Sequence, residues 1–194
     1  MIIGLTGQTG AGKSTVCSFL SKKNFCIIDC DKVSREVTDK GSPIILKLAD
    51  AFGSDIVLED GSLNRKLLAE RAFCEKSKTE LLNSITHPEI INAIKNRISE
   101  CKGENIVLDA PTLFESGADK LCDKVIAVLA DVTSRKNRII QRDLLSCYQA
   151  EVRLSAQKDN SFFESRADAV LYNNGTIYEL EEKTLNALKE MGAV

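Results

Sequence analysis

An eight-residue stretch near the N-terminus, GQTGAGKS at residues 7–14, limits the folds open to this chain more than any other feature. It matches the phosphate-binding loop (P-loop) pattern, in which a glycine and four variable residues precede Gly-Lys-Ser. The stretch follows an apolar run at residues 1–6 and precedes a helical pattern at 13–23. Because a strand–loop–helix setting is what gives this pattern its meaning, we expect a nucleoside triphosphate site in an α/β fold.

The residues expected to bind the nucleotide follow from this motif. Glycines let backbone N–H groups turn toward phosphates, while the following helix presents its positive N-terminal end. Lys13 is expected to reach the β- and γ-phosphates, and the Ser14 hydroxyl to ligate Mg²⁺ directly. The predicted ATP-binding residues of the loop are Gly7, Gly10, Ala11, Gly12, Lys13, Ser14 and Thr15.

Continuous apolar segments predict buried parallel strands at residues 1–6, 25–29, 105–109, 124–129 and 169–172. Helical patterns separate them, which favours an open P-loop NTPase-type parallel sheet with helices on both faces. Two long intervals, 32–102 and 134–166, carry amphipathic periodicity and are predicted to be helical insertions. The predicted α/β core then comprises 1–31, 103–133 and 167–194. Inside the first interval, helices are expected at 44–52 (ended by Gly53), 64–73 and 88–98.

Charge and cysteine content narrow the class of protein. A net charge of −2 gives no basic field for nucleic acid, and the longest apolar runs are too short to cross a membrane. No signal peptide is evident. Seven cysteines without a C-x-x-C pair, beside a single histidine, argue against a zinc site. We expect them to be reduced, small, buried residues of a cytoplasmic protein.

Carboxylates at two predicted strand ends suggest transfer chemistry rather than a switch, because no N-K-x-D segment for guanine is present. Asp29 and Asp31 end the second strand, are expected to share a face toward the P-loop, and could accept a proton from an attacking hydroxyl. Alternatively, Asp31 caps a helix that starts at Lys32. Asp109 ends the third strand, where it either lies in the second shell of Mg²⁺ or caps the following loop.

The interval 134–166 is unusually basic and has the character of a lid. Arg135, Arg138 and Arg142 are spaced i, i+3 and i+7, which places them on one helix face. A closing lid needs such cations over a triphosphate. We favour a solvated basic face for Arg135 and Lys136, and a phosphate contact for Arg142.

Taken in order, the segments resemble the dephospho-coenzyme A kinase family over residues 4 to about 180. The resemblance rests on the joint order and spacing of GLTGQTGAGKST (4–15), IDCD (28–31), GSLNRKLLAERAF (61–73), HPEI (87–90), IVLDAPTLFESG (106–117), QRD (141–143), LSCYQAEVRLSAQ (145–157) and ADAVLYNNGT (167–176).

The resemblance implies ATP- and Mg²⁺-dependent phosphorylation of the ribose 3′-hydroxyl of dephospho-CoA, the last step of coenzyme A biosynthesis. It implies that 32–102 binds the coenzyme A acceptor and that 134–166 is the lid. Asp31 then takes the general-base position and Arg142 the lid position on the phosphates. The remaining implied residues are Thr6, Arg65 and His87 near the acceptor and Asn174 in the loop beside adenine.

Some positions depart from the family pattern, and two other functions stay open. Gln8 stands where the family usually has glycine, Thr9 replaces an apolar residue, and Asn64 replaces an acid.

Another P-loop small-metabolite kinase, for nucleosides or nucleotides, would share the same scaffold. A nucleotide-sensing protein would bind ATP without phosphorylating an acceptor. The presence of Asp31 and Arg142 argues against this function, because a protein that only binds ATP needs neither residue. The oligomeric state is left open.

Overall fold

The computed structural model describes residues 1–101, 103 and 105–194. The chain divides into two compact units, the first made of Met1–Ile28 with Cys101–Val194 and the second of Asp29–Glu100. Residue 102, where the first predicted insertion ends, lies outside the described residues. No helix among those described is long and apolar enough to cross a membrane.

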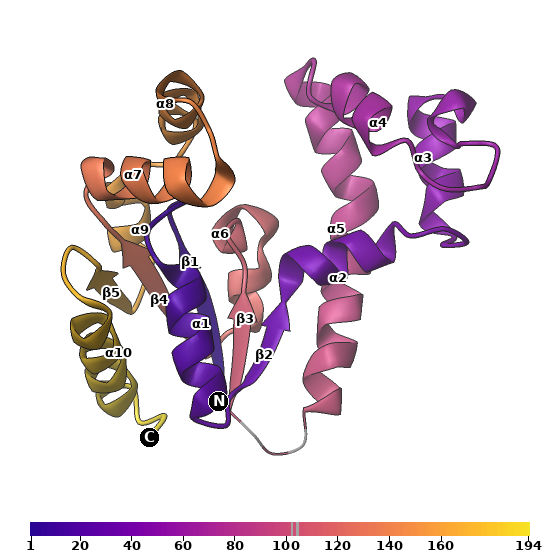
Figure 1. Ribbon diagram of the computed structural model, residues 1–194. Coiled ribbons are helices and arrows are strands. Elements are labelled where there is room, and N and C mark those ends of the chain that lie inside the picture. The colour runs from indigo at the N-terminus through magenta and orange to yellow at the C-terminus, as the bar shows by residue number, and fades with distance from the viewer. Residues whose placement is uncertain (102, 104) are drawn as a thin grey trace. The chain divides into compact units, whose positions relative to one another are not determined.

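A five-stranded sheet contains every strand predicted from the sequence (Figure 1). Its order is β2-β3-β1-β4-β5, and the recorded pairings of β1 with β3 and β4, and of β4 with β5, are parallel. The observed bounds lie within a residue or so of those predicted. They are β1 (Ile2–Gly7), β2 (Cys26–Asp29), β3 (Ile106–Asp109), β4 (Lys124–Leu129) and β5 (Ala169–Tyr172).

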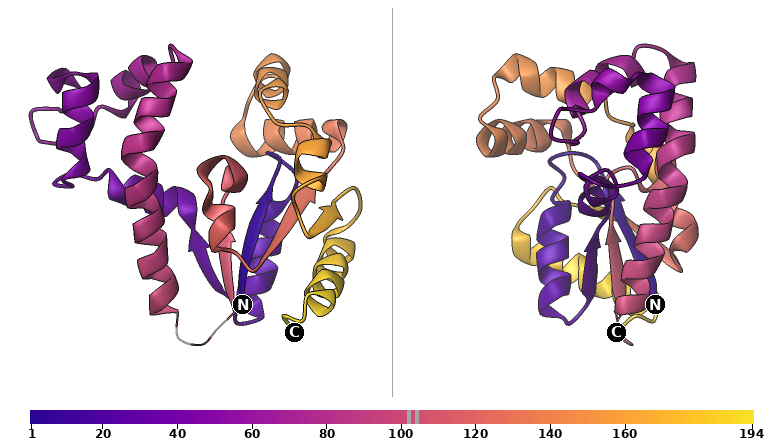
Figure 2. Two further views of the ribbon diagram at one scale, coloured as in Figure 1. Left: turned by 180° about the vertical axis from the view of Figure 1, so that it is seen from behind. Right: turned by 90° about the vertical axis from the view of Figure 1, so that its right-hand side faces the viewer.

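Helices cover both faces of this sheet, because alternate side chains of the strands are buried on opposite sides. Ile126 and Val128 of β4 pack in one cluster with α1 (Lys13–Lys22) and α10 (Ile177–Glu190) (Figures 1 and 2). Ala127 and Leu129 pack in another with Phe163 of α9 (Asn160–Glu164). The short α6 (Leu113–Ser116) and a 3₁₀ turn, η2 (Ala118–Leu121), follow β3. The predicted P-loop NTPase-type α/β sheet is confirmed.

The basic interval is helical, as predicted, and forms α7 (Val132–Asp143), α8 (Cys147–Ser155) and α9. Each helix begins at a side-chain cap: Asp131 accepts from Ser134 N, and Ser146 forms a capping box with Gln149. Leu144 ends α7 in the left-handed conformation, with φ 53°, and is 91% exposed. The chain therefore turns sharply between α7 and α8.

The second unit is helical, with α2 (Cys30–Val37), α3 (Ile44–Phe52), a 3₁₀ turn η1 (Ser54–Ile56), α4 (Arg65–Ala72) and α5 (Lys76–Glu100). Gly53, with φ 104°, ends α3 as predicted. The prediction of a helix starting at Pro88 is wrong, because Pro88 lies inside the 25-residue α5. A proline removes one helical hydrogen bond, and packing of α5 against α2, α3 and α4 outweighs that loss.

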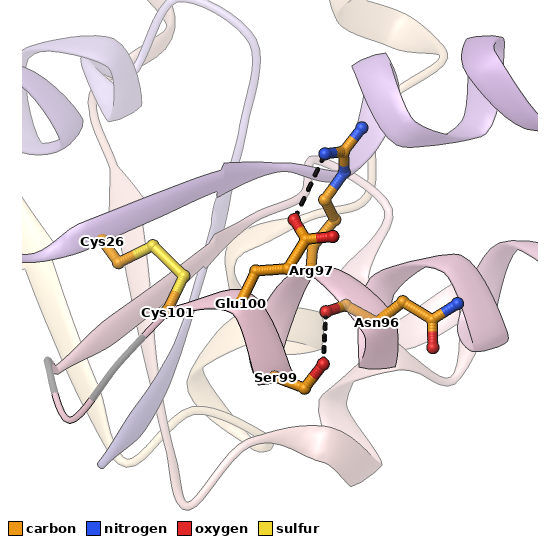
Figure 3. The surroundings of a disulfide bond; sticks show 6 residues. All are labelled: Cys26, Asn96, Arg97, Ser99, Glu100 and Cys101. Carbon is orange, nitrogen blue, oxygen red and sulfur yellow. Dashed lines mark hydrogen bonds and ion pairs between the residues drawn. A yellow bond between two sulfur atoms is a disulfide. The ribbon is translucent and has the colours of Figure 1, made fainter.

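A disulfide joins Cys26, the first residue of β2, to Cys101, 75 residues later (Figure 3). The expectation of reduced cysteines is therefore wrong for this pair. Strand pairing brings the two close, since Cys26 N donates to Asn105 O at 2.8 Å, just beyond Cys101 in the chain. Burial is also wrong for Cys74 and Cys147, which are exposed.

Candidate functional site

The P-loop needs glycine at both ends for steric reasons. A Cβ on Gly7, at the end of β1, would lie 2.1 Å from Val128 O, and Gly7 has φ 139°. A Cβ on Gly12 would lie 2.2 Å from Asn173 Nδ2, and Gly12 caps α1 with φ 106°. Any other residue would both strain the backbone and displace a neighbouring element. The loop is thus held tightly between β1 and the N-terminus of α1.

Donors from two other elements bind the outward carbonyls of this loop. Arg135 Nε donates to Thr9 O at 3.1 Å, and Arg138 donates to Gly10 O at 3.2 Å. Asn173 Nδ2, just after β5, donates to Ala11 O at 2.7 Å. With three of its carbonyls bound in this way, the loop backbone is held in place before the N-terminus of α1, where an anion is favoured.

A cavity of about 670 Å³ opens over the loop, entirely within the first unit. That volume lies in the usual range for small-molecule sites. Its lining combines the P-loop with α7, α8 and the start of α10. The lining residues are Gly7, Gln8, Thr9, Gly10, Gly12, Lys13, Ser14, Thr15, Pro111, Arg138, Gln141, Arg142, Arg153, Asn173, Gly175, Ile177 and Leu180.

Lys13 forms an ion pair with Asp109 at the end of β3. Strand pairing places the carboxylate there, because Leu5 of β1 is the register partner of Asp109. The next residue, Ala110, donates its N–H to Leu5 O, not to the Asp109 side chain. Ser14 is exposed at the cavity beside Lys13. An ammonium, a hydroxyl and a carboxylate therefore lie along adjoining elements.

Arginines from α7 and α8 line the opposite part of the cavity. Arg142 donates two hydrogen bonds to Asp143, at 2.7 and 2.9 Å, and Arg153 donates another at 2.6 Å. The hydrogen bond from Arg142 lowers the pKa of the Asp143 carboxyl below its ordinary value and raises that of Arg142. One carboxylate thus holds two cations beside the P-loop.

Arg135 does not belong to a solvated basic face, so that interpretation is wrong. Its side chain is buried, at 4% exposure, because α7 packs on the P-loop where Arg135 reaches Thr9 O. Burial lowers the pKa of Arg135 from its ordinary value. Lys136 is half-buried and donates to Glu151 Oε1 of α8 at 2.6 Å. Hydrogen bonds with Cys147 and Glu151 raise the pKa of Lys136.

Two residues that the sequence assigned to the site, Thr6 and Asn174, form hydrogen bonds with other segments of the first unit. Thr6 is fully buried and donates its hydroxyl to Pro111 O at 3.1 Å. Asn174 accepts from Asp131 N at 2.9 Å, while its neighbour Asn173 lines the cavity. The sequence had singled out Asn174 of this loop as the ATP-binding residue, and Asn173 is the one that lines the cavity. The sequence also gave no individual role to Arg153, which counted only as one of the basic residues of the interval 134–166.

The acidic pair is arranged differently from the prediction, within the second unit. Asp29 is extended and caps α2, accepting from Lys32 N at 2.9 Å. Asp31 lies in the first turn of α2 and is exposed. The two carboxylates do not share an extended face, and the capping residue is Asp29 instead of Asp31, because α2 starts at Cys30.

Arg65 and His87 also lie in the second unit. Arg65, the first residue of α4, donates to Thr38 Oγ1 at 2.6 Å and to Arg35 O at 3.1 Å, at the C-terminal end of α2. The bond to Arg35 O reaches a backbone carbonyl of the last turn of α2, where a helix leaves carbonyls open. His87 is half-buried in α5, and burial lowers its pKa.

A family model and the curated relatives agree on one family. A family model described as dephospho-CoA kinase matches residues 1–179. A dephospho-CoA kinase of Fusobacterium nucleatum is 39% identical over 183 residues, 94% of each chain. A crystal structure from Thermus thermophilus has a TM-score of 0.85 at 28% identity, covering 98% of this chain and 97% of that one. A dephospho-CoA kinase from Campylobacter jejuni has the same fold, with a TM-score of 0.61 at 23% identity, covering 98% and 96%.

Proposed function

The chain belongs to the dephospho-CoA kinase family, and we propose that it transfers the γ-phosphoryl group of ATP to the ribose 3′-hydroxyl of dephospho-CoA. The observation that carries this proposal is the P-loop cavity, in which Lys13, Arg142 and Arg153 gather beside a phosphate-binding loop. Phosphoryl transfer depends on positioning and on neutralising charge, and this set of residues supplies both. Coenzyme A and ADP are the expected products.

Lys13 and Arg142 are the proposed cationic catalytic residues. Lys13 follows the loop glycines directly, and Arg142 lines the same cavity from α7. Both now pair with carboxylates, Asp109 and Asp143, so each cation is oriented before phosphates arrive. Bound phosphate oxygens would compete with these carboxylates for the cations. Negative charge that spreads over the transferring group is stabilised by such donors.

Asp31 is proposed as the general base that accepts the proton of the 3′-hydroxyl. Its exposure in the first turn of α2 leaves the carboxylate accessible from solvent, and it matches the family's IDCD position. A carboxylate in this role typically contributes about 10²- to 10⁴-fold to the rate. Asp29 has a separate structural task as the cap of α2.

The donor set at the P-loop fits Mg²⁺, which prefers hard oxygen ligands. Ser14 presents an exposed hydroxyl at the cavity, and Asp109 presents a carboxylate on the neighbouring strand. We assign direct ligation to Ser14 and second-shell contact to Asp109. When bound, Mg²⁺ neutralises charge on the β- and γ-phosphate oxygens.

The remaining assignments complete the proposal. Residues 7, 10–15 and Asn174 bind ATP, while Thr6, Arg65 and His87 contribute to binding dephospho-CoA. Segments 1–31, 103–133 and 167–194 form the nucleotide-binding core, 32–102 the acceptor insertion and 134–166 the lid. A cytoplasmic location is part of the proposal. So is the lack of a nucleic-acid or membrane partner, since a net charge of −2 gives no basic field for either.

An acceptor panel tests the proposal against another small-metabolite kinase. Purified protein, ATP and Mg²⁺ are incubated with dephospho-CoA, nucleosides or nucleotides, and the products are scored by mass. We expect one added phosphoryl group on dephospho-CoA alone. Preferential phosphorylation of a nucleoside or nucleotide would favour the alternative kinase, and ATP binding without any acceptor turnover would favour a nucleotide sensor.

A further inference from the structure

Gln8, the second residue of the P-loop, is buried and joins the loop to the segment between α8 and α9. Its side chain is 4% exposed, and Nε2 donates to Lys158 O at 3.0 Å. The next residue, Thr9, donates its backbone N–H to Gln157 Oε1 at 3.0 Å. Two glutamine amides therefore form a pair of bonds between residues 8–9 and 157–158, here termed the amide latch.

The orientation of the Gln8 amide is set by this contact. Lys158 O is an acceptor, so the NH₂ end of the amide must face it. Gln8 Oε1 is buried and receives no hydrogen bond from any part of the chain that the structure describes. A buried oxygen without a partner lowers stability. The hydrogen bond from the Gln8 NH₂ group to Lys158 O is therefore what accounts for a polar side chain at this buried position.

The latch acts on the peptide that leads into the phosphate-binding part of the loop. Thr9 has both backbone groups bound, its N–H by Gln157 and its C=O by Arg135. The next residue, Gly10, has φ 79° and is free to adopt many backbone angles. Gly10 adds little restraint of its own, so the direction of the following N–H groups depends on the bonds to the loop: those that fix Thr9, and those of Arg138 and Asn173 to the next two carbonyls.

The geometry points to Gln8 as a positioning residue: we propose that the amide latch holds the P-loop in its nucleotide-binding conformation before ATP arrives. A loop ordered in advance loses less conformational freedom on binding and so binds more tightly. The latch also ties one end of the 134–166 segment to the P-loop. This inference rests on the proposed function only in taking ATP as the ligand of the cavity.

The test replaces Gln8 by methionine, which has similar length and no amide. The dissociation constant for ATP is measured by calorimetry without an acceptor, so the readout is independent of turnover. Loss of one ordinary hydrogen bond corresponds to about a fivefold weaker Kd. We expect Q8M to weaken ATP binding about fivefold to tenfold with a binding stoichiometry equal to that of the wild type. If Gln8 only stabilised the fold, Q8M would lower the fraction of folded protein. The number of ATP molecules bound per chain would then fall, while the Kd of the folded protein stayed constant.

Two comparisons sharpen this test. Q157M breaks the other bond of the latch and should match Q8M, and the double variant should bind no more weakly than either, because the two bonds act as one unit. Q149M is the matched control, since it makes the same substitution in α8 and breaks the bond that Gln149 accepts from the N-cap, Ser146 N; Gln149 is not among the described residues that line the cavity. It should leave the Kd unchanged.

The proposal would be refuted if Q8M bound ATP with the Kd of the wild type. It would also be refuted if the losses of affinity in Q8M and Q157M added in the double variant. If Q8M does not fold, Q157M carries the test alone, with the same expected loss and the same opposing result. Failure of wild-type protein to phosphorylate dephospho-CoA would instead refute the proposed function and leave the Kd comparison standing.

Discussion

Opening the disulfide between Cys26 and Cys101 is expected to lower the free energy of unfolding by several kilocalories per mole. The bond closes a loop with a sequence separation of 75 residues, which contains the entire second unit, Asp29–Glu100. In the chain-entropy model, a loop of this length restricts the unfolded chain by about 15 cal/mol/K, or about 4.5 kcal/mol at 25 °C. Reduction returns that freedom to the unfolded state, and Cys26 N keeps its bond to Asn105 O.

Urea unfolding, followed by circular dichroism with and without dithiothreitol, measures this effect. With a slope of about 2 kcal/mol/M, reduction should lower the midpoint by about 2 M urea. C26S and C101S should each reproduce the reduced wild type, because each removes the same bond. C74S is the control, since Cys74 is exposed and its thiol donates to Arg71 O, three residues earlier. Equal midpoints for oxidised and reduced wild type would refute the reasoning.

The remaining predictions concern the site and its pH dependence. D31N should bind ATP normally and lose about 10²-fold or more in kcat; a kcat near that of the wild type in steady-state assays would exclude Asp31 as the base. G12A should weaken ATP binding in a calorimetric titration, because its Cβ would meet Asn173 Nδ2 at 2.2 Å and displace the amide from Ala11 O; an unchanged Kd would contradict this. Burial lowers the pKa of His87 below 6.5, so the unfolded chain binds that proton more readily. Stability from this source is complete above pH 6.5 and falls as the pH decreases toward the folded-state pKa. In urea unfolding at a series of pH values, H87Q should lose less stability than the wild type as the pH falls below 6.5. An identical loss in both proteins would exclude His87 as the source.

Most of the core could be predicted because its signals are local. Each apolar run became a strand, since a strand buried on both faces needs continuous apolar residues. Gly53 ended α3 because a positive φ there suits glycine. The P-loop was identified from the spacing of its glycines with Lys13, and steric contacts at Gly7 and Gly12 now explain that spacing.

Errors arose where packing between distant segments outweighed local preference. Pro88 suggests a helix start, but α5 continues through it because α2, α3 and α4 pack along its length. Arg135 lies in a basic interval and was expected on a solvated face, but α7 lies on the P-loop and buries it. Asp29 and Asp31 differ because α2 begins between them, so the first caps a helix that the second belongs to.

By itself, the sequence determined the class of sheet, the phosphate-binding loop and, through the order of its motifs, the family. The sheet and the loop depend on residues close together in the chain, and the family depends on the order of such short motifs along it. Only the tertiary structure decided which groups hold the loop in place: Arg135, Arg138 and Asn173 on its carbonyls, and Gln8 against Lys158. It likewise paired Cys26 with Cys101. The physical reason is that such contacts join residues tens of positions apart, and only the folded chain brings them within hydrogen-bonding or covalent distance.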